Sequence, residues 1–207
     1  CDTKTLSRDL GEHVILVLMS PFSLPKKSGE YDDLKELSAP WGVVYGPVPS
    51  RRLGLSLGIN LLGSSEKVCN FDCVYCDLGP TQIKVSQIKK KTDFQTLKEL
   101  EESLSKKLVE LTAKKIPVEC ITFSGQGEPT VAPEFDEAVV LVKKLRDELA
   151  PGLPIKVLTN GAELDQNKII RALNLMDECI VKVDAGQDAA LERVNAPLAR
   201  MNIAKLI

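Results

Sequence analysis

The sequence lacks a long apolar run. The longest one near its start, Val14 to Met19, is far too short for a membrane-spanning helix, which needs about 20 apolar residues. A secretory signal peptide would place a basic segment ahead of a longer apolar stretch. We therefore expect a cytosolic protein. Because the chain opens on Cys1 rather than on Met, we also expect it to be a piece of a longer protein.

An excess of either charge is absent as well. The 207 residues contain 27 Lys and Arg against 29 Asp and Glu, for a net charge of -2. This balance gives no overall attraction to nucleic acid or to a membrane surface, so a polyanion would have to meet a local basic patch. With 43% apolar and 27% charged residues, the composition is that of an ordinary globular domain with one sizeable core.

Helical and strand periodicities alternate regularly from about residue 92 onward. Thr92 and Gln95 resemble a capping box, and leucines then recur every three or four residues up to Leu111, which predicts an amphipathic helix. Asp165 can cap a later helix. The pattern predicts strands over residues 118–123, 155–158 and 179–183, and helices over residues 134–149, after 165, and from 188 to 194.

Short apolar strands separated by helices imply parallel pairing through right-handed crossovers. The fold class is therefore α/β, either a (β/α) barrel or an open doubly wound sheet. A first strand near residues 65–68 would give four βα units, which is fewer than a closed eight-stranded barrel needs. We expect a partial (β/α) barrel over residues 63–207.

Residues 1–62 differ from this pattern and are predicted to form an N-terminal extension. A strand over 14–19 and a short helix over 31–37 are expected there. Residues 41–45 and 55–62 should form a strand pair that flanks a loop rich in Pro and Gly over residues 46–54.

Three of the six cysteines fall within eight residues, as Cys69, Cys73 and Cys76 in a C-x-x-x-C-x-x-C arrangement. In a reducing compartment such spacing points to metal rather than to disulfides. Thiolates are the ligands that iron–sulfur clusters need, and one compact loop can bring three of them to one cluster. The fourth iron of a [4Fe–4S] cluster would then have an open position for a substrate or cosubstrate.

Two alternative metal assignments stay open at this point. A structural zinc site would need a fourth ligand, but the single His, His13, is remote in sequence, and Cys120 and Cys179 fall within predicted strands. An electron-transfer ferredoxin would need a fourth cysteine, and none follows Cys76 at a suitable spacing. We expect His13, Cys120 and Cys179 to be structural.

Polar and glycine-rich sequences follow three successive predicted strands. Because parallel strands place their carboxyl ends at one edge of a sheet, these sequences should meet in one site. Glycines would let a ligand approach the backbone, and Glu128 could accept a hydrogen bond from an ammonium group. The candidate residues are Ser124, Gly125, Gly127, Glu128 and Pro129 after the first strand, Thr159 and Asn160 after the second, and Asp184 after the third.

Together these motifs resemble the signature of the radical S-adenosylmethionine (SAM) superfamily, in which an aromatic residue, here Tyr75, precedes the last cysteine. The resemblance implies a six-unit barrel, a [4Fe–4S] cluster on Cys69, Cys73 and Cys76, and SAM chelated by the open iron. Reduction by a flavodoxin or ferredoxin would cleave SAM to methionine and a 5′-deoxyadenosyl radical. Glu128 and its flanking glycines would contact the SAM amino group, and Thr159, Asn160 and Asp184 would bind its ribose or carboxylate.

The loop over residues 45–54 adds a resemblance to the wyosine-tRNA-synthesis branch of that superfamily, which implies tRNA as a substrate. A protein substrate is the alternative. Members of that branch that form wyosine carry a second cluster on N-terminal cysteines, whereas Cys1 alone precedes Cys69 here. A phosphate-contacting patch could come from Arg51, Arg52, Lys84 and Lys89 to Lys91.

Overall fold

The computed structural model describes residues 42–50, 52–63, 66–85, 94–198 and 201–205, together with the backbone of residues 14–18. Several sequence-based expectations fall on other residues and stay predictions. These are the short helix over 31–37, the structural role of His13, and the contribution of Arg51 and Lys89 to Lys91 to a basic patch.

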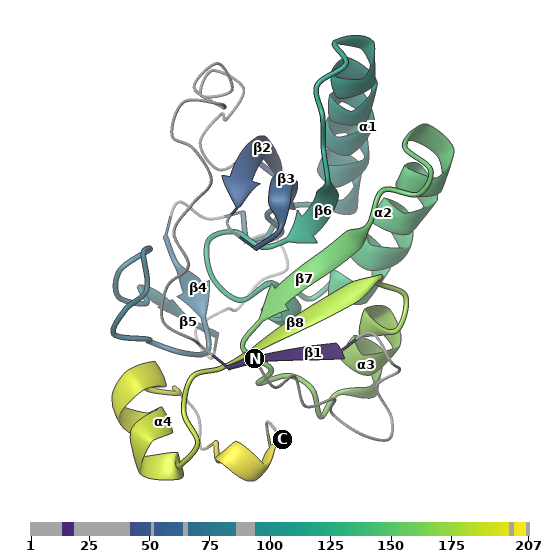
Figure 1. Cartoon of the computed structure of the whole chain (residues 1–207). Helices are drawn as coiled ribbons and strands as arrows, with labels where there is room; N and C mark the ends of the chain where they lie inside the picture. Colours follow the sequence, from purple (N-terminus) through teal and green to yellow (C-terminus); the bar gives the residue numbers. More distant parts are fainter. Residues whose placement is uncertain are drawn as a thin grey trace.

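A six-stranded sheet forms the centre of the molecule, in the order β1-β8-β7-β6-β3-β2 (Figure 1). All neighbouring strands run parallel except β2 and β3, which are antiparallel. A separate parallel pair joins β4 (Val68–Cys69) to β5 (Ile83–Lys84). The strands of the main sheet are β1 (Val14–Leu18), β2 (Val44–Ser50), β3 (Gly54–Ile59), β6 (Cys120–Phe123), β7 (Ile155–Thr159) and β8 (Glu178–Val183).

In the part of the chain that the structure describes, four α-helices alternate with the later strands: α1 (Leu97–Ala113), α2 (Phe135–Leu149), α3 (Asn167–Leu173) and α4 (Asp188–Asn195). Short 3-10 turns, η4 (Pro129–Val131) and η5 (Ile203–Lys205), follow β6 and α4. The expected helices and strands from residue 118 to 195 are therefore present, with boundaries shifted by one or two residues.

Two predicted helix starts are wrong. The capping box of α1 consists of Thr96 and Glu99 rather than Thr92 and Gln95, because the Thr96 hydroxyl accepts from the Glu99 amide and Glu99 bonds back to the Thr96 amide. Asp165 does not cap α3, which begins after Gln166 without a side-chain cap.

From β3 to β8 the chain moves across the sheet in one direction, and β1 lies beyond β8 at the far edge. Strands β3, β6, β7 and β8 are neighbours in chain order, and α1 packs on α2 and α2 on α3 along one side of the sheet (Figure 1). A strand order that follows the chain is a feature of (β/α) barrels. The observed sheet is open, so the α/β class and parallel core are confirmed and a barrel is not.

The strand that pairs in parallel with β6 is β3, not the expected strand near residues 65–68. Residues 55–59 are buried throughout, as a central parallel strand requires, and they pair in parallel with β6. The predicted strand pair is present in this same sheet as β2 and β3, which run antiparallel. The predicted loop over residues 46–54 is wrong in its first half, because β2 continues to Ser50 through its pairing with β3. The division of the chain at residue 62 into two domains stays a prediction.

The main core lies between the sheet and its helices. Phe123 of β6 and Phe135 of α2 are fully buried there, with ring centroids 5.6 Å apart in an edge-on arrangement. Cys120 and Cys179 are also fully buried, and their thiols donate to the carbonyls of Leu53 and Leu173. The core thus fixes the strands whose carboxyl ends carry the candidate site.

Candidate functional site

The three clustered cysteines lie on the loop over residues 66–85, between β3 and α1, which we call the cysteine loop. Its local turns are closed by bonds from the Cys76 amide to the Cys73 carbonyl, 3.1 Å, and from the Gly79 amide to the Cys76 carbonyl, 2.9 Å. Cys69 is buried, Cys73 and Cys76 are half-buried, and all three thiols are free. The loop therefore offers three available sulfur ligands.

Polar N–H groups point at two of these sulfurs. The Phe71 amide donates to Cys69 Sγ at 3.4 Å, and the Asn160 amide group lies 3.8 Å from the same atom. Asn195 Nδ2 lies 3.4 Å from Cys73 Sγ. Burial, and then the nearby charge of Glu128, raises the pKa of the Cys69 thiol to about 12.

The cysteine loop is fastened to the glycine-rich loop after β6 by backbone pairing. Val68 and Gly127 form a parallel bridge, with the Val68 amide 2.8 Å from the Gln126 carbonyl and the Glu128 amide 3.1 Å from the Val68 carbonyl. A Cβ atom at Gly127 would lie 1.7 Å from that Val68 oxygen. Only glycine fits where the two loops meet.

Glu128 joins the ends of β6 and β7. Its carboxylate, 3% exposed, accepts from the hydroxyls of Thr130 and Thr159 at 2.6 and 2.7 Å and from the Asn160 amide at 2.8 Å. Burial raises the pKa of Glu128, while these hydrogen bonds act in the opposite direction. The predicted Glu128 contact with an ammonium group stays a prediction, and in this structure the carboxylate holds two strand ends together.

Replacing Glu128 by Ala is expected to lower the free energy of unfolding by about 1–3 kcal/mol, because the buried donors around it lose their acceptor. Glu101→Ala is the matched control, since Glu101 is exposed on α1 and should cost less than about 0.5 kcal/mol. Urea unfolding of both variants measures the difference. Equal midpoints for the two variants would show that Glu128 does not hold the strand ends.

Asn160 makes a second link between β7 and the cysteine loop. Its Nδ2 donates to Asn70 Oδ1 at 2.6 Å, and Asn70 Nδ2 donates to Glu163 Oε1 at 2.8 Å. Asn70 and Glu163 were not among the predicted site residues. Asn70 lies within the cysteine motif, but nothing in its type or spacing indicates a partner on another strand end.

Asp184, at the end of β8, forms a third set of side-chain contacts, after those of Glu128 and Asn160. Its Oδ2 accepts from the Tyr75 hydroxyl and from Asn195 Nδ2 at 2.6 Å. Lys182 Nζ lies 3.6 Å from the same oxygen and 3.9 Å from the centre of the Tyr75 ring. Burial, and next the bond to Asp184, raises the pKa of Tyr75. Within the described residues, Asp184 Oδ1 and Asn195 Oδ1 are buried without a hydrogen-bond partner.

Tyr45 joins the site from β2. Its hydroxyl lies 2.8 Å from Ser124 Oγ, and burial raises its pKa. The ring covers Gly58, where a Cβ would come within 2.1 Å of Tyr45 Cζ. Sequence reasoning missed this residue, although a glycine inside a buried strand often marks such a close approach.

All predicted SAM-site and cysteine residues thus lie on the cysteine loop or at the carboxyl ends of β6, β7 and β8. Within the described ranges, no three side chains of His, Cys, Asp or Glu are positioned together so that they could hold a metal ion. Of the residues predicted to form a phosphate-contacting patch, Arg52 and Lys84 are exposed, and the others lie outside the described residues. No helix in the part of the chain described could cross a membrane.

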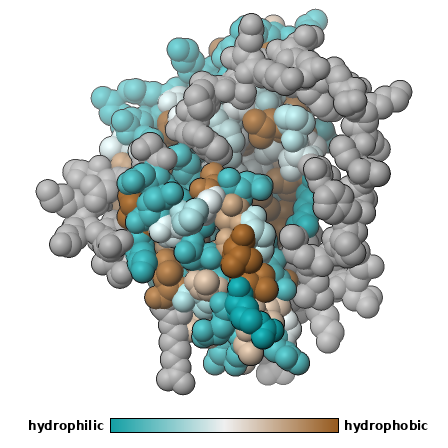
Figure 2. Space-filling view, turned by 90° about the vertical axis from the view of Figure 1, so that its left-hand side faces the viewer, coloured by the Kyte–Doolittle hydropathy of each residue, from teal (hydrophilic) through white to brown (hydrophobic). Residues whose placement is uncertain are grey.

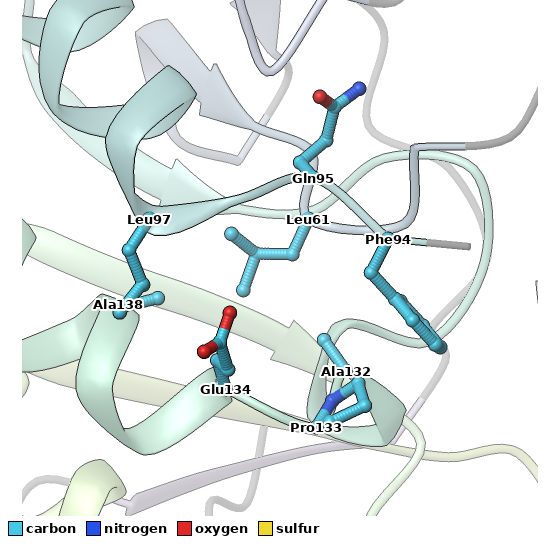
Figure 3. A pocket seen from close by; sticks show the side chains of 8 residues that line it. All are labelled: Leu61, Phe94, Gln95, Leu97, Ala132, Pro133, Glu134 and Ala138. Atoms are coloured by element: carbon cyan, nitrogen blue, oxygen red, sulfur yellow. The ribbon is translucent and has the colours of Figure 1, made fainter. Parts of the chain in front are cut away.

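A small cavity between the starts of α1 and α2 is separate from this site (Figure 3). Its lining is largely apolar, and none of the predicted site residues contributes to it. The lining residues are Leu61, Phe94, Gln95, Leu97, Ala132, Pro133, Glu134 and Ala138.

Comparison with known proteins finds relatives that are about one third identical to this chain. The chain is 32% identical over 158 residues to a UPF0026 protein of Helicobacter pylori, covering 76% of this chain and 47% of that protein. It is 35% identical over 164 residues to a UPF0026 protein of Synechocystis, covering 79% and 56%. A protein named GTPase Obg from Brachyspira hyodysenteriae is 31% identical over 165 residues, 79% of this chain and 22% of that protein.

The chain therefore spans about half the length of its UPF0026 relatives. The family model of the Radical SAM superfamily matches residues 67–205, a range that holds the cysteine loop and the ends of β6, β7 and β8. The wyosine branch is not distinguished by these matches and stays a prediction. The chain belongs to the radical SAM superfamily.

Proposed function

We propose that this chain is the cofactor-binding part of a radical SAM enzyme, with Cys69, Cys73 and Cys76 as ligands of a [4Fe–4S] cluster. The donor set fits, because three free thiols share one loop and N–H groups approach two of the sulfurs. Hydrogen bonds to the sulfurs are among the means by which proteins adjust iron–sulfur clusters. When bound and reduced, the cluster supplies the electron that cleaves SAM to methionine and a 5′-deoxyadenosyl radical.

The strand ends supply the SAM site of this proposal. The buried, unpartnered oxygens of Asp184 and Asn195 are suited to accept from hydroxyl or ammonium donors, since a buried acceptor without a donor is costly. Tyr75 offers a ring beside them, while Gly125 and Gly127 make room for Asn60 and for the Val68 carbonyl, and so hold the glycine-rich loop against its neighbours. These residues bind and orient the cosubstrate. The observation that carries the proposal is their convergence with the cysteine loop.

Anaerobic reconstitution tests the proposal. The iron-loaded chain, and the full-length protein that contains it, should release 5′-deoxyadenosine and methionine when SAM and dithionite are added. One equivalent of zinc with no SAM binding would instead support a zinc scaffold, and a cluster that neither binds nor cleaves SAM would support an electron carrier.

The physiological partners are also part of the proposal. We propose a cytoplasmic flavodoxin or ferredoxin as electron donor, because Val74, next to Tyr75 on the cysteine loop, is 74% exposed where a small redox protein could approach. Figure 2 views the molecule from the side on which β4 and β5 lie in Figure 1, and apolar residues lie among polar ones on that face. The substrate we propose is tRNA, from the resemblance of residues 45–54. Salt-sensitive tRNA binding by the full-length protein, weakened in Arg51→Ala/Arg52→Ala, would support it, and salt-insensitive binding or none would favour a protein substrate.

A further inference from the structure

The C-terminal end of α4 and the residues that follow it lie against the cysteine loop and bond to its backbone, which the cysteine motif does not indicate. The Asp72 amide donates to the carbonyls of Asn195 and Ala196 at 3.0 and 3.1 Å, and the Val74 amide donates to Val194 at 3.0 Å. Phe71 and Pro197 form an antiparallel bridge. We call residues 194–198 the loop brace.

Further along, the Leu198 amide donates to the Asn70 carbonyl at 2.9 Å. The left-handed conformation of Ala196, with φ of 41°, ends α4 and turns the chain into this pairing. Both sides of the cysteine loop are therefore fixed by backbone bonds, one through Val68 and Gly127 and the other through the brace.

Asn195 connects this brace to the chemistry of the site. Its side chain, with the residue only 2% exposed, places Nδ2 at 3.4 Å from Cys73 Sγ, 2.6 Å from Asp184 Oδ2 and 3.0 Å from the Tyr75 hydroxyl. One amide group thus contacts a thiol of the cysteine loop and the carboxylate at the end of β8. The end of α4 is thereby linked to both.

We infer that Asn195 is a positioning residue that holds Cys73 and adjusts the charge on its sulfur. The inference rests on the proposed function for its electronic part. An N–H group directed at a thiolate stabilises negative charge on sulfur, and this favours the reduced state of a cluster, which is one electron more negative. Through Asp184, the same amide group also fixes the Tyr75 hydroxyl beside the sulfur.

Two measurements on Asn195→Ala test this role. In the metal-free protein, amide hydrogen exchange at Asp72 and Val74 should accelerate about tenfold, because about 1.4 kcal/mol of local hydrogen bonding is lost. In the reconstituted protein, the midpoint potential should fall, so that the reduced-to-oxidised ratio at a fixed electrode potential drops about fivefold. A change confined to packing would not alter this ratio.

Glu192→Ala is the matched control, since Glu192 is exposed on the same helix and should leave both quantities unchanged. If Asn195→Ala does not fold, Asn195→Leu keeps a similar side-chain size and adds no charge while removing the N–H donors, and the same shifts are expected. Unchanged exchange and unchanged potential would overturn the inference. Faster exchange with an unchanged potential would overturn the effect of Asn195 on the charge of the Cys73 sulfur, and would leave only its role in holding the cysteine loop.

Failure of the wild-type protein to take up iron would overturn the proposed function and the electronic role of Asn195 together. The exchange measurement in metal-free protein would still decide whether Asn195 holds the cysteine loop. The two failures are therefore distinguishable.

Discussion

Gly127→Ala is expected to lower the free energy of unfolding by about 2–6 kcal/mol, as the sum of overpacking and backbone strain. The new Cβ would lie 1.7 Å from the carbonyl oxygen of Val68, and the φ of Gly127 is 141°. Because the obstacle is backbone rather than a rotatable side chain, relief requires the glycine-rich loop and the cysteine loop to separate. Urea unfolding measures the loss.

Substitutions at two other glycines separate the effect of overpacking from the effect of backbone strain. Gly152 has a φ of 84° and no atom within 4 Å of the position that a Cβ would take, so Gly152→Ala should cost about 1–2 kcal/mol from strain alone. Gly186 has an open surrounding and no strained φ, so Gly186→Ala should have almost no effect. A Gly127→Ala variant no less stable than Gly152→Ala would contradict the close contact between the loops.

The alternation of helices and strands after residue 118 could be predicted because it depends on local periodicity. Residues such as Phe135, Val139 and Val142 recur at helical spacing, and all three are fully buried. The capping box could not be placed from local pattern alone, since Thr92 with Gln95 and Thr96 with Glu99 both offer an N-cap and a side chain three residues later. The second pair forms, and α1 begins directly after it.

Long-range pairing explains the other differences between the sequence-based predictions and the structure. The position of β3 beside β6 depends on contacts between residues about sixty positions apart. Asn195 contacts the site from a segment that carries no recognisable motif, and Tyr45 begins the loop over residues 45–54, whose sequence gives no indication of a contact with Ser124. In contrast, the strand ends were predictable because parallel strands bring their carboxyl ends to one edge, so Glu128, Thr159 and Asn160 had to lie near one another.

Exchange of Cys69, Cys73 or Cys76 for Ser, one at a time, is expected to abolish stable cluster uptake, from about four irons per chain to almost none. Serine keeps the size and hydrogen-bonding capacity of the side chain, but its oxygen is a poor ligand for a site that depends on soft sulfur donors. Iron and sulfide analysis after anaerobic reconstitution measures the effect, and circular dichroism of the metal-free variants checks that each one is folded.

Cys120→Ala and Cys179→Ala are the controls for this result, because both cysteines are fully buried in the sheet and their thiols contact backbone carbonyls. Both variants should lose some stability through the missing sulfur while keeping the iron content of the wild type. Iron loss in Cys120→Ala as complete as in Cys73→Ser would mean that the cluster is not confined to the cysteine loop. Full iron content in all three serine variants would mean that the loop does not ligate iron, and the assignment of the open iron to a SAM site would then fail with it.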